Sequence, residues 1–274
     1  MTRETTIIEA GRPPRHYWRE LWQYRELFYF LAWRDILVRY KQTVIGVTWA
    51  LIRPFLTMVV FTVIFGKLAG LPSEGVPYPI LVFAAMLPWQ FFATSLAACS
   101  DSLVNNANLL SKVYFPRLVV PTSAIAVSFV DFLISFAILL ALMVWYQFVP
   151  SWQIITLPWF VAIAIGAALG TGIWFASLNV RYRDFRYVVP FLVQFGLYIS
   201  PVGFSSSVVP ARWRFWYSLN PLVGVIDGFR WAILGGETDL YLPSFLFSLV
   251  LVVLLVSSGL WYFRQVERTF ADTI

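Results

Sequence analysis

Few side chains in this sequence are suited to covalent or metal chemistry. Cys99 is the only cysteine and His16 the only histidine among the 274 residues. One cysteine can form neither an intramolecular disulfide nor a thiolate zinc site, and one histidine excludes a multi-histidine metal centre. The sequence also lacks the G-x-x-x-x-G-K-[ST] phosphate loop and the G-x-S-x-G nucleophile elbow. We therefore predict a chain with no catalytic residue, no metal site and no cofactor of its own.

Asp131 is the one acidic residue deep within an apolar segment, with Ser128 and Ser135 one helical turn before and after it. Burying a carboxylate in a membrane is costly, so such a residue is a candidate for function. A proton relay is poorly supported, because no lysine, histidine or second carboxylate lies near it in any apolar segment. We favour a role in helix packing or in facing a pore. The aromatic residues considered for the same two roles are Trp89, Phe92 and Tyr198.

The elements that must position these residues are long apolar segments. Hydrophobic residues make up 59% of the chain and charged residues 12%, about half the charged share of a soluble domain. Six segments are long enough to cross a bilayer as helices, which takes about 20 residues. They cover residues 44–68, 80–99, 118–149, 155–178, 187–207 and 242–263. Because the apolar residues are continuous rather than alternating, we predict helices and not barrel strands.

The predicted fold class is an all-α integral membrane protein with six transmembrane helices. We expect one membrane domain over residues 1–274, in which 1–43 form a cytoplasmic or interfacial segment, 44–263 the six-helix domain and 264–274 a cytoplasmic tail. Fifteen of the 20 Lys and Arg residues fall on one side of this arrangement and four on the other. The positive-inside rule then places both termini in the cytoplasm. The net charge of +6 thus reflects topology and does not indicate a nucleic-acid partner.

Two polar segments on the cytoplasmic side are predicted to be helical. Residues 17–33 carry aromatic and leucine side chains at helical spacing, which is typical of a helix lying on the membrane surface. This helix is either a simple anchor or an anchor that also docks a soluble partner. Residues 100–117 predict a short helix capped by Ser100 or Asp101 and ended by Pro116. It is either a connector between spans or an element that transmits force from a partner.

The outward segment 208–241 is too apolar for a free loop and too interrupted for a clean span. Its prolines and glycines divide it into short pieces, which we interpret as re-entrant helices in the outer leaflet. Such broken helices favour a transport pathway over a purely structural bundle. Two smaller patterns concern packing. Pro54 follows Arg53 within the first span and predicts a kink, and Gly166 with Gly170 forms a GxxxG pattern suited to close helix contact.

Several ordered motifs resemble the membrane subunits of bacterial polysaccharide exporters of the ABC-2 class. They are RYKQT at 39–43 with Arg53-Pro54, MLPWQFF at 86–92, NLLSKVYFPR at 108–117, NVRYRD at 179–184, NPL at 220–222 and GFRW at 228–231. The resemblance covers about residues 17–235, and it is the order of the motifs that makes it specific. Each motif alone is a weak signal.

The resemblance implies a homodimer joined to two copies of a cytoplasmic ABC ATPase, which would supply ATP and Mg. The dimer would export a lipid-linked polysaccharide such as O-antigen, capsular polysaccharide or teichoic acid, usually on undecaprenyl diphosphate, across the bacterial inner membrane. The candidate contacts for the diphosphate are Arg39, Lys41 and Arg53. The candidate contacts for the ATPase are Asp101, Asn105, Asn108, Arg181 and Asp184. The candidate residues of a gate at the periplasmic mouth are Trp213, Trp216 and Arg230.

Three other functions stay open. The first is an ABC-2 exporter of a drug or a lipid. The second is a membrane-embedded glycosyl- or acyltransferase, although the sequence lacks the paired acids or the histidine that such an enzyme needs. The third is an ion-coupled carrier, in which Asp131 would have to carry the coupling.

Overall fold

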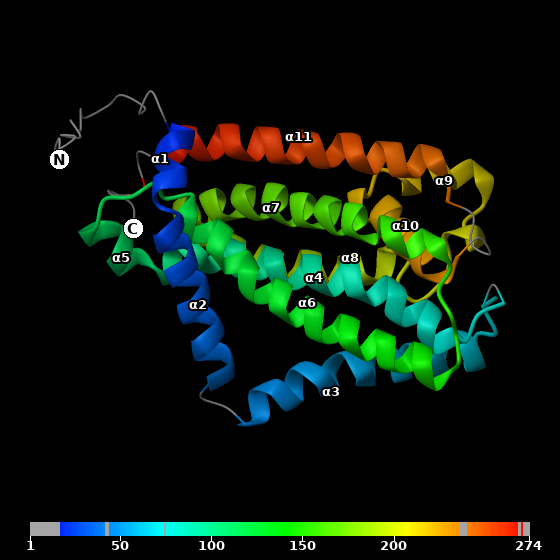
Figure 1. The fold of residues 1–274 in the computed structure, drawn as a ribbon. Coiled ribbons are helices and arrows are strands. Elements are labelled where there is room, and N and C mark those ends of the chain that lie inside the picture. Colours follow the sequence, from blue (N-terminus) through cyan, green and yellow to red (C-terminus); the bar gives the residue numbers. More distant parts are fainter. Residues whose placement is uncertain (1–16, 42–43, 74, 236–239, 268–269, 271–274) are drawn as a thin grey trace.

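The structure is a computed structural model that describes residues 17–41, 44–73, 75–235, 240–267 and 270. All regular secondary structure in these residues is helical. The helices α4 (Tyr78–Asn105), α6 (Val119–Trp145), α7 (Leu157–Arg181) and α11 (Leu242–Val266) run side by side as the body of the bundle (Figure 1). The predicted all-α membrane class is therefore confirmed.

The remaining helices are arranged around this body. The helices α1 (Tyr17–Gln23) and α2 (Arg25–Lys41) cross one end of it, next to the short α5 (Ala107–Lys112) (Figure 1). We call this the α2 end. The opposite end, which we call the far end, holds α9 (Ala211–Tyr217) and the start of α10 (Pro221–Leu234). Along the side of the bundle lie α3 (Val44–Phe61), its π-helical continuation η1 (Thr62–Leu68) and α8 (Phe185–Ile199). Two short 3-10 helices, η2 (Trp152–Thr156) and η3 (Ser206–Val208), complete the fold.

The predicted number of spans is not confirmed. Five described helices are long and apolar enough to cross a membrane, namely those at Leu51–Leu68, Tyr78–Asn105, Val119–Trp145, Trp152–Arg181 and Leu242–Val266. The expected fifth span at 187–207 is instead α8, which has 15 residues and a length of about 22 Å against the roughly 30 Å of hydrocarbon. It ends because Ser200, extended at φ −93° and ψ 152°, precedes a proline, and that position disfavours helix.

Two other boundaries differ from the sequence expectation. The predicted surface helix at 17–33 is interrupted by a turn at Tyr24 and then continues to Lys41 as α2. The helix expected to start at Ser100 or Asp101 does not start there, because α4 continues without a break to Asn105. Asp101 is therefore inside a helix and not a cap, and the separate short helix α5 begins only at Ala107. Pro54 lies inside α3 without ending it.

Close backbone contact holds α7 against α11, as the GxxxG pattern predicts. A Cβ atom added to Gly170 would lie 2.7 Å from the backbone nitrogen of Val256, so only glycine fits there. Next to this contact, Trp174 stacks on Tyr262 with ring centroids 4.5 Å apart and donates a 3.0 Å hydrogen bond from Nε1 to Ser258.

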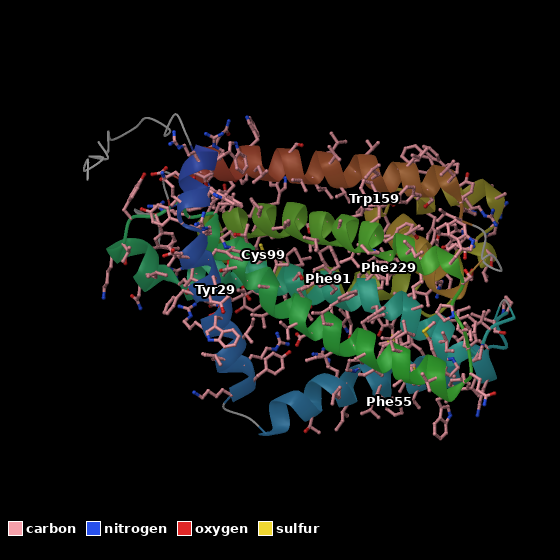
Figure 2. The ribbon with its side chains drawn as sticks, in the orientation of Figure 1. Tyr29, Phe55, Phe91, Cys99, Trp159 and Phe229 are labelled. Atoms are coloured by element: carbon pink, nitrogen blue, oxygen red, sulfur yellow. The ribbon has the colours of Figure 1, made fainter. Side chains whose placement is uncertain are left out.

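Aromatic side chains fill the centre of the bundle. Phe91 on α4 and Phe229 on α10 both contact Phe132 on α6 at right angles or nearly so, and both point inward in Figure 2. Phe55, by contrast, lies on the outer side of α3 and is 45% exposed (Figure 2). The interior of one chain is therefore packed with side chains, while α3 and α8 carry exposed apolar surface.

Candidate functional site

Asp131 is held by the end of α2. Its carboxylate forms an ion pair with Arg39, with 2.7 Å between the carboxylate oxygen and Nη2. It also accepts a hydrogen bond from the hydroxyl of Tyr40. The carboxylate lies about 18 Å along α6 from the first residue of that helix, and its side chain is 17% exposed. Burial and the nearby Asp131 carboxylate raise the pKa of the Tyr40 hydroxyl, which keeps it protonated and able to donate. We call this contact the α2–α6 clamp. Its partners are 91 and 92 residues away in sequence.

A second polar contact joins α2 to the end of α4. Nη2 of Arg34 donates a 2.9 Å hydrogen bond to the side-chain oxygen of Asn106, whose amide nitrogen donates in turn to the carbonyl of Ser102 at 2.8 Å. Arg34 also pairs with the neighbouring Asp35 at 2.8 Å. These bonds hold α2 across the point where α4 gives way to α5. Sequence reasoning missed Arg34 and Asn106, because neither lies at a recognisable spacing from the other.

The candidate ATPase contacts all lie at the α2 end, but they differ in exposure. The side chains of Asn105, Asn108, Arg181 and Asp184 are exposed. Asp101 is half-buried and is engaged within the chain, since the amide of Asn179 donates to its carboxylate at 2.9 Å. The same amide also donates to the carbonyl of Ser100 at 3.1 Å. Asn179, the first residue of the NVRYRD motif, thus ties α7 to α4.

The end of α11 is anchored to the start of α6 at the same end. Oε1 of Glu267 accepts a 3.0 Å hydrogen bond from the backbone nitrogen of Arg117, whose guanidinium donates to the carbonyl of Glu267. The guanidinium of Arg264 lies 5.0 Å from the ring centre of Tyr17. Burial raises the pKa of Glu267, while Arg117, Tyr17 and Arg264 oppose that rise. Sequence reasoning missed this cluster, although Arg117 ends a recognised motif.

The three diphosphate candidates come from two successive helices, α2 and α3. Arg39 is engaged by Asp131, although its side chain is still 47% exposed. Lys41, at the last position of α2, and Arg53, on α3, are exposed. The segment 42–43, which belongs to the RYKQT motif, lies outside the described residues, as does His16.

The aromatic channel candidates fall into two groups. Trp89 and Phe92 are 4% and 8% exposed, with ring centroids 6.0 Å apart, and Trp89 packs against Gly196 of α8. These two residues therefore pack α4 against its neighbours within the chain. Tyr198 is 64% exposed and belongs to an aromatic face of α8. The other members of that face are Tyr187, Phe191 and Phe195.

The gate candidates also differ in exposure. Trp213 and Trp216 on α9 are 53% and 63% exposed, but Arg230 on α10 is 2% exposed. Its guanidinium donates to three backbone carbonyls, those of Leu81 at 3.3 Å, Phe204 at 2.7 Å and Val202 at 3.2 Å. Arg230 thus fastens the turn after α8 to α4 and α10 in the interior, and it is not a surface residue. The NPL motif beside it has a local role, since the Asn220 side chain caps α10 by accepting from the nitrogen of Leu222 at 3.0 Å.

A cavity of about 570 Å³ with both polar and apolar walls opens beside Arg230 at the far end. It is lined by four successive segments of the chain: the serine run after α8, then α9, α10 and the start of α11. Sequence reasoning missed it, although the run Ser205-Ser206-Ser207 was a visible signal. Among the described residues, no three His, Cys, Asp or Glu side chains are grouped as metal ligands.

Comparison with known proteins decides the family. The ABC-2 type transporter family matches residues 26–234, which is most of the chain and spans both the α2–α6 clamp and Arg230. The chain belongs to the ABC-2 transporter family. This ABC-2 protein is therefore a transporter permease of the inner membrane, and five of its described helices are long and apolar enough to span one.

Curated relatives align over almost the whole ABC-2 chain. An O-antigen export system permease protein RfbA from Myxococcus xanthus is 29% identical over 93% of this chain and 98% of its own. A protein of the same name from Klebsiella pneumoniae is 26% identical over 91% of this chain and 95% of its own. The polysialic acid transport protein KpsM from Escherichia coli is 24% identical over 85% of this chain and 91% of its own.

Proposed function

We propose that this chain is the membrane subunit of an ABC exporter that moves a lipid-linked, O-antigen-like polysaccharide from cytoplasm to periplasm. The observation that carries the proposal is the near full-length similarity to permeases named for O-antigen and polysialic acid export. Both names refer to polymers of sugars. The chain has no phosphate loop, so ATP and Mg would be bound by a separate ATPase subunit. Undecaprenyl diphosphate is the carrier that the family resemblance implies.

A homodimer would provide the passage. The centre of one chain is filled, with residues 80–87 of α4 no more than 2% exposed. The exposed aromatic face of α8 is a surface suited to sugar rings, because aromatic faces pack on the apolar faces of sugars. Tyr187, Phe191, Phe195 and Tyr198 on this face are 53–80% exposed. Two copies that enclose these faces, together with α3, would form a channel between them, with membrane lipids around the outside.

The α2 end would face the cytoplasm and two copies of the ATPase. The lysine and arginine distribution supports this orientation, because the positive-inside rule assigns the sequence segments that contain α1, α2 and α5 to the cytoplasm. The exposed ATPase candidates Asn105, Asn108, Arg181 and Asp184 would meet the partner. The α2–α6 clamp would then pass movement of α2 to the middle of a membrane helix. At the periplasmic side, α9 and α10 would act as the re-entrant helices, with Trp213 and Trp216 at the mouth.

The clamp also bears on the ion-coupled alternative. Asp131 is already paired with a permanent cation and with a protonated tyrosine hydroxyl. A carboxylate held in this way has its charge compensated within the chain and is committed to joining α2 to α6. This geometry supports an ATP-driven permease over a carrier that is driven by an ion gradient.

The test is to co-purify the full chain with the ATPase encoded beside it and to measure ATP hydrolysis with and without lipid-linked glycan. We expect a stable complex whose hydrolysis rises severalfold with the glycan. Asp184→Arg should weaken the complex, whereas Arg212→Asp, which reverses an exposed charge at the far end, should not. Hydrolysis that rises with hydrophobic drugs and ignores glycans would instead support a drug exporter.

A further inference from the structure

The end of α11 and the start of α6 cap each other at the α2 end. The carboxylate of Glu267 accepts a hydrogen bond from the backbone nitrogen of Arg117, just before α6 begins, where Leu118 supplies no side-chain cap of its own. In return, the guanidinium of Arg117 donates to the carbonyl of Glu267, which lies in the last turn of α11, where carbonyls lack partners within the helix. A carboxylate at a helix start and a cation at a helix end also suit both helix dipoles.

We call this reciprocal contact of Arg117 and Glu267 the α6–α11 joint. It links two helices that pack against different neighbours: α11 packs mainly on α7 and α10, whereas α6 packs mainly on α4 and α2. In Figure 1, α7 lies between α11 and α6. The joint therefore connects two helices that the rest of the bundle holds apart.

Aromatic side chains cover the joint. Phe270 is 1% exposed, packs on Phe263 with 5.5 Å between ring centroids, and lies with its ring centre 5.9 Å from the guanidinium of Arg117. Tyr17, the first residue of α1, is buried with Arg264 over its ring, so α1 is held at the same place. Hydrogen bonds are stronger in such surroundings than in water.

The joint stands where the chain returns from α5. That helix extends beyond the end of the bundle (Figure 1). Its last residue, Lys112, is exposed, and Val113 and Tyr114 after it are each 52% exposed. Phe115, at 4% exposed, returns to the interior, and Arg117 follows two residues later. A displacement of α5 therefore reaches α6 through a residue that is bonded to α11.

From the joint, α11 runs to the far end as one uninterrupted helix of 25 residues. There it contacts α10 through the backbone. A Cβ atom added to Gly224 would lie 2.7 Å from the carbonyl oxygen of Ser244, and the nitrogen of Gly224 donates to Oγ of Ser248 at 3.1 Å. Rigid helices in contact of this kind can carry energetic coupling between distant sites.

We propose that Arg117 and Glu267 are positioning residues of the export cycle, which make α6 and α11 move together when the ATPase displaces α5. The inference rests on the proposed function, because it needs an ATPase that binds at α5. It differs from the α2–α6 clamp, which joins α2 to the middle of α6 and does not involve α11. Through the joint, work done at the α2 end reaches α10 at the far end.

The test measures the amount of glycan exported per ATP hydrolysed by the purified complex of the full chain and its ATPase in proteoliposomes. Glu267→Leu removes the acceptor for the Arg117 nitrogen, whereas Glu267→Gln keeps an oxygen that can accept. Ser258→Ala is the matched control, because it removes a hydrogen bond between α11 and α7 at about 13 Å along α11 from the joint. We expect the ratio to fall about threefold or more in Glu267→Leu only.

The ratio separates positioning from stability, since a loss of folded complex lowers export and hydrolysis together. Arg117→Leu keeps the backbone nitrogen and removes only the guanidinium, so it replaces Glu267→Leu if that variant does not assemble. Its ratio should fall about twofold or more. Unchanged ratios in both leucine variants, or an equal fall in Ser258→Ala, would overturn the inference and leave the export function intact. No glycan export by the wild-type complex would instead refute the proposed function.

Discussion

The two ends of the molecule join their segments through different kinds of hydrogen bond. At the α2 end the polar side chains of different helices meet one another: Asp131 with Arg39 and Tyr40, and Arg34 with Asn106. At the far end a single side chain, Arg230, donates to the backbone carbonyls of Leu81, Val202 and Phe204. The first arrangement links helices through pairs of side chains. The second fixes the backbone of the turn after α8.

This difference teaches that a charge in an apolar segment can be satisfied in two ways. Asp131 and Arg230 are both residues whose burial in an apolar environment is costly. The charge of Asp131 is compensated by the guanidinium of Arg39. Arg230 is satisfied instead by three backbone carbonyls. Hydrogen bonds of either kind hold the segments that they join in fixed positions.

The largest expected effect comes from Arg230→Met, which removes the charged donor from three carbonyls at once. Hydrogen bonds to charged groups contribute about 1.5–3 kcal/mol each, and buried carbonyls left without donors cost more. We expect the free energy of unfolding to fall by about 3 kcal/mol or more, measured by denaturant titration of the purified protein. Arg212→Met is the control, because Arg212 is exposed on α9, and it should change stability by less than about 0.5 kcal/mol. Equal losses would show that Arg230 is not a fastening point.

A smaller effect is expected when the α2–α6 clamp is opened. In a double-mutant cycle of Asp131→Asn with Arg39→Gln, we expect a coupling free energy of about 1 kcal/mol, because the ion pair is only partly exposed. The measurement is the unfolding free energy of the four proteins. In a parallel cycle of Asp131→Asn with Arg25→Gln, the two effects on the unfolding free energy should be additive. Arg25 is at the other end of α2, where its guanidinium lies over the ring of Trp22 and not near Asp131. Additivity in both cycles would mean that the clamp does not couple α2 to α6.

The smallest effect concerns the pH dependence of the α11 anchor. Because burial raises the pKa of Glu267, the folded chain keeps this proton to a higher pH than the unfolded chain does. Its contribution to stability is complete below about pH 4.3 and is lost as the pH rises through the folded pKa. Relative to Glu267→Gln, wild-type stability should therefore decline over that window. Parallel pH profiles for the two proteins would show that Glu267 titrates as an exposed glutamate does.

Much of the fold follows from the sequence because long apolar segments in lipid can only be helices. The span predicted at 242–263 corresponds to α11, and the GxxxG pattern at Gly166 and Gly170 marks its contact with α7. The predicted length of α8 was wrong. The sequence stays apolar past Ile199, but the helix ends there because Ser200 is extended and precedes a proline. Local apolarity does not reveal such a stop, although the proline was visible.

The site residues were harder to predict, because their partners come from distant segments. Asp131 was recognised as unusual, but its partner Arg39 was assigned to the substrate, since nothing in the spacing joins two residues 92 positions apart. Arg230 was named as a candidate for the periplasmic gate from its place in the outward segment, but its bonds to backbone carbonyls inside the protein could not be predicted from the sequence.

The most direct test of the account is the movement of a lipid-linked glycan in proteoliposomes that contain this chain with or without its ATPase. The central claim is that the chain is a passage whose work is supplied by a partner. We predict glycan transfer only when the ATPase and hydrolysable ATP are both present, and none from an imposed proton or sodium gradient. Transfer by the chain alone, or transfer driven by an ion gradient without ATP, would contradict it.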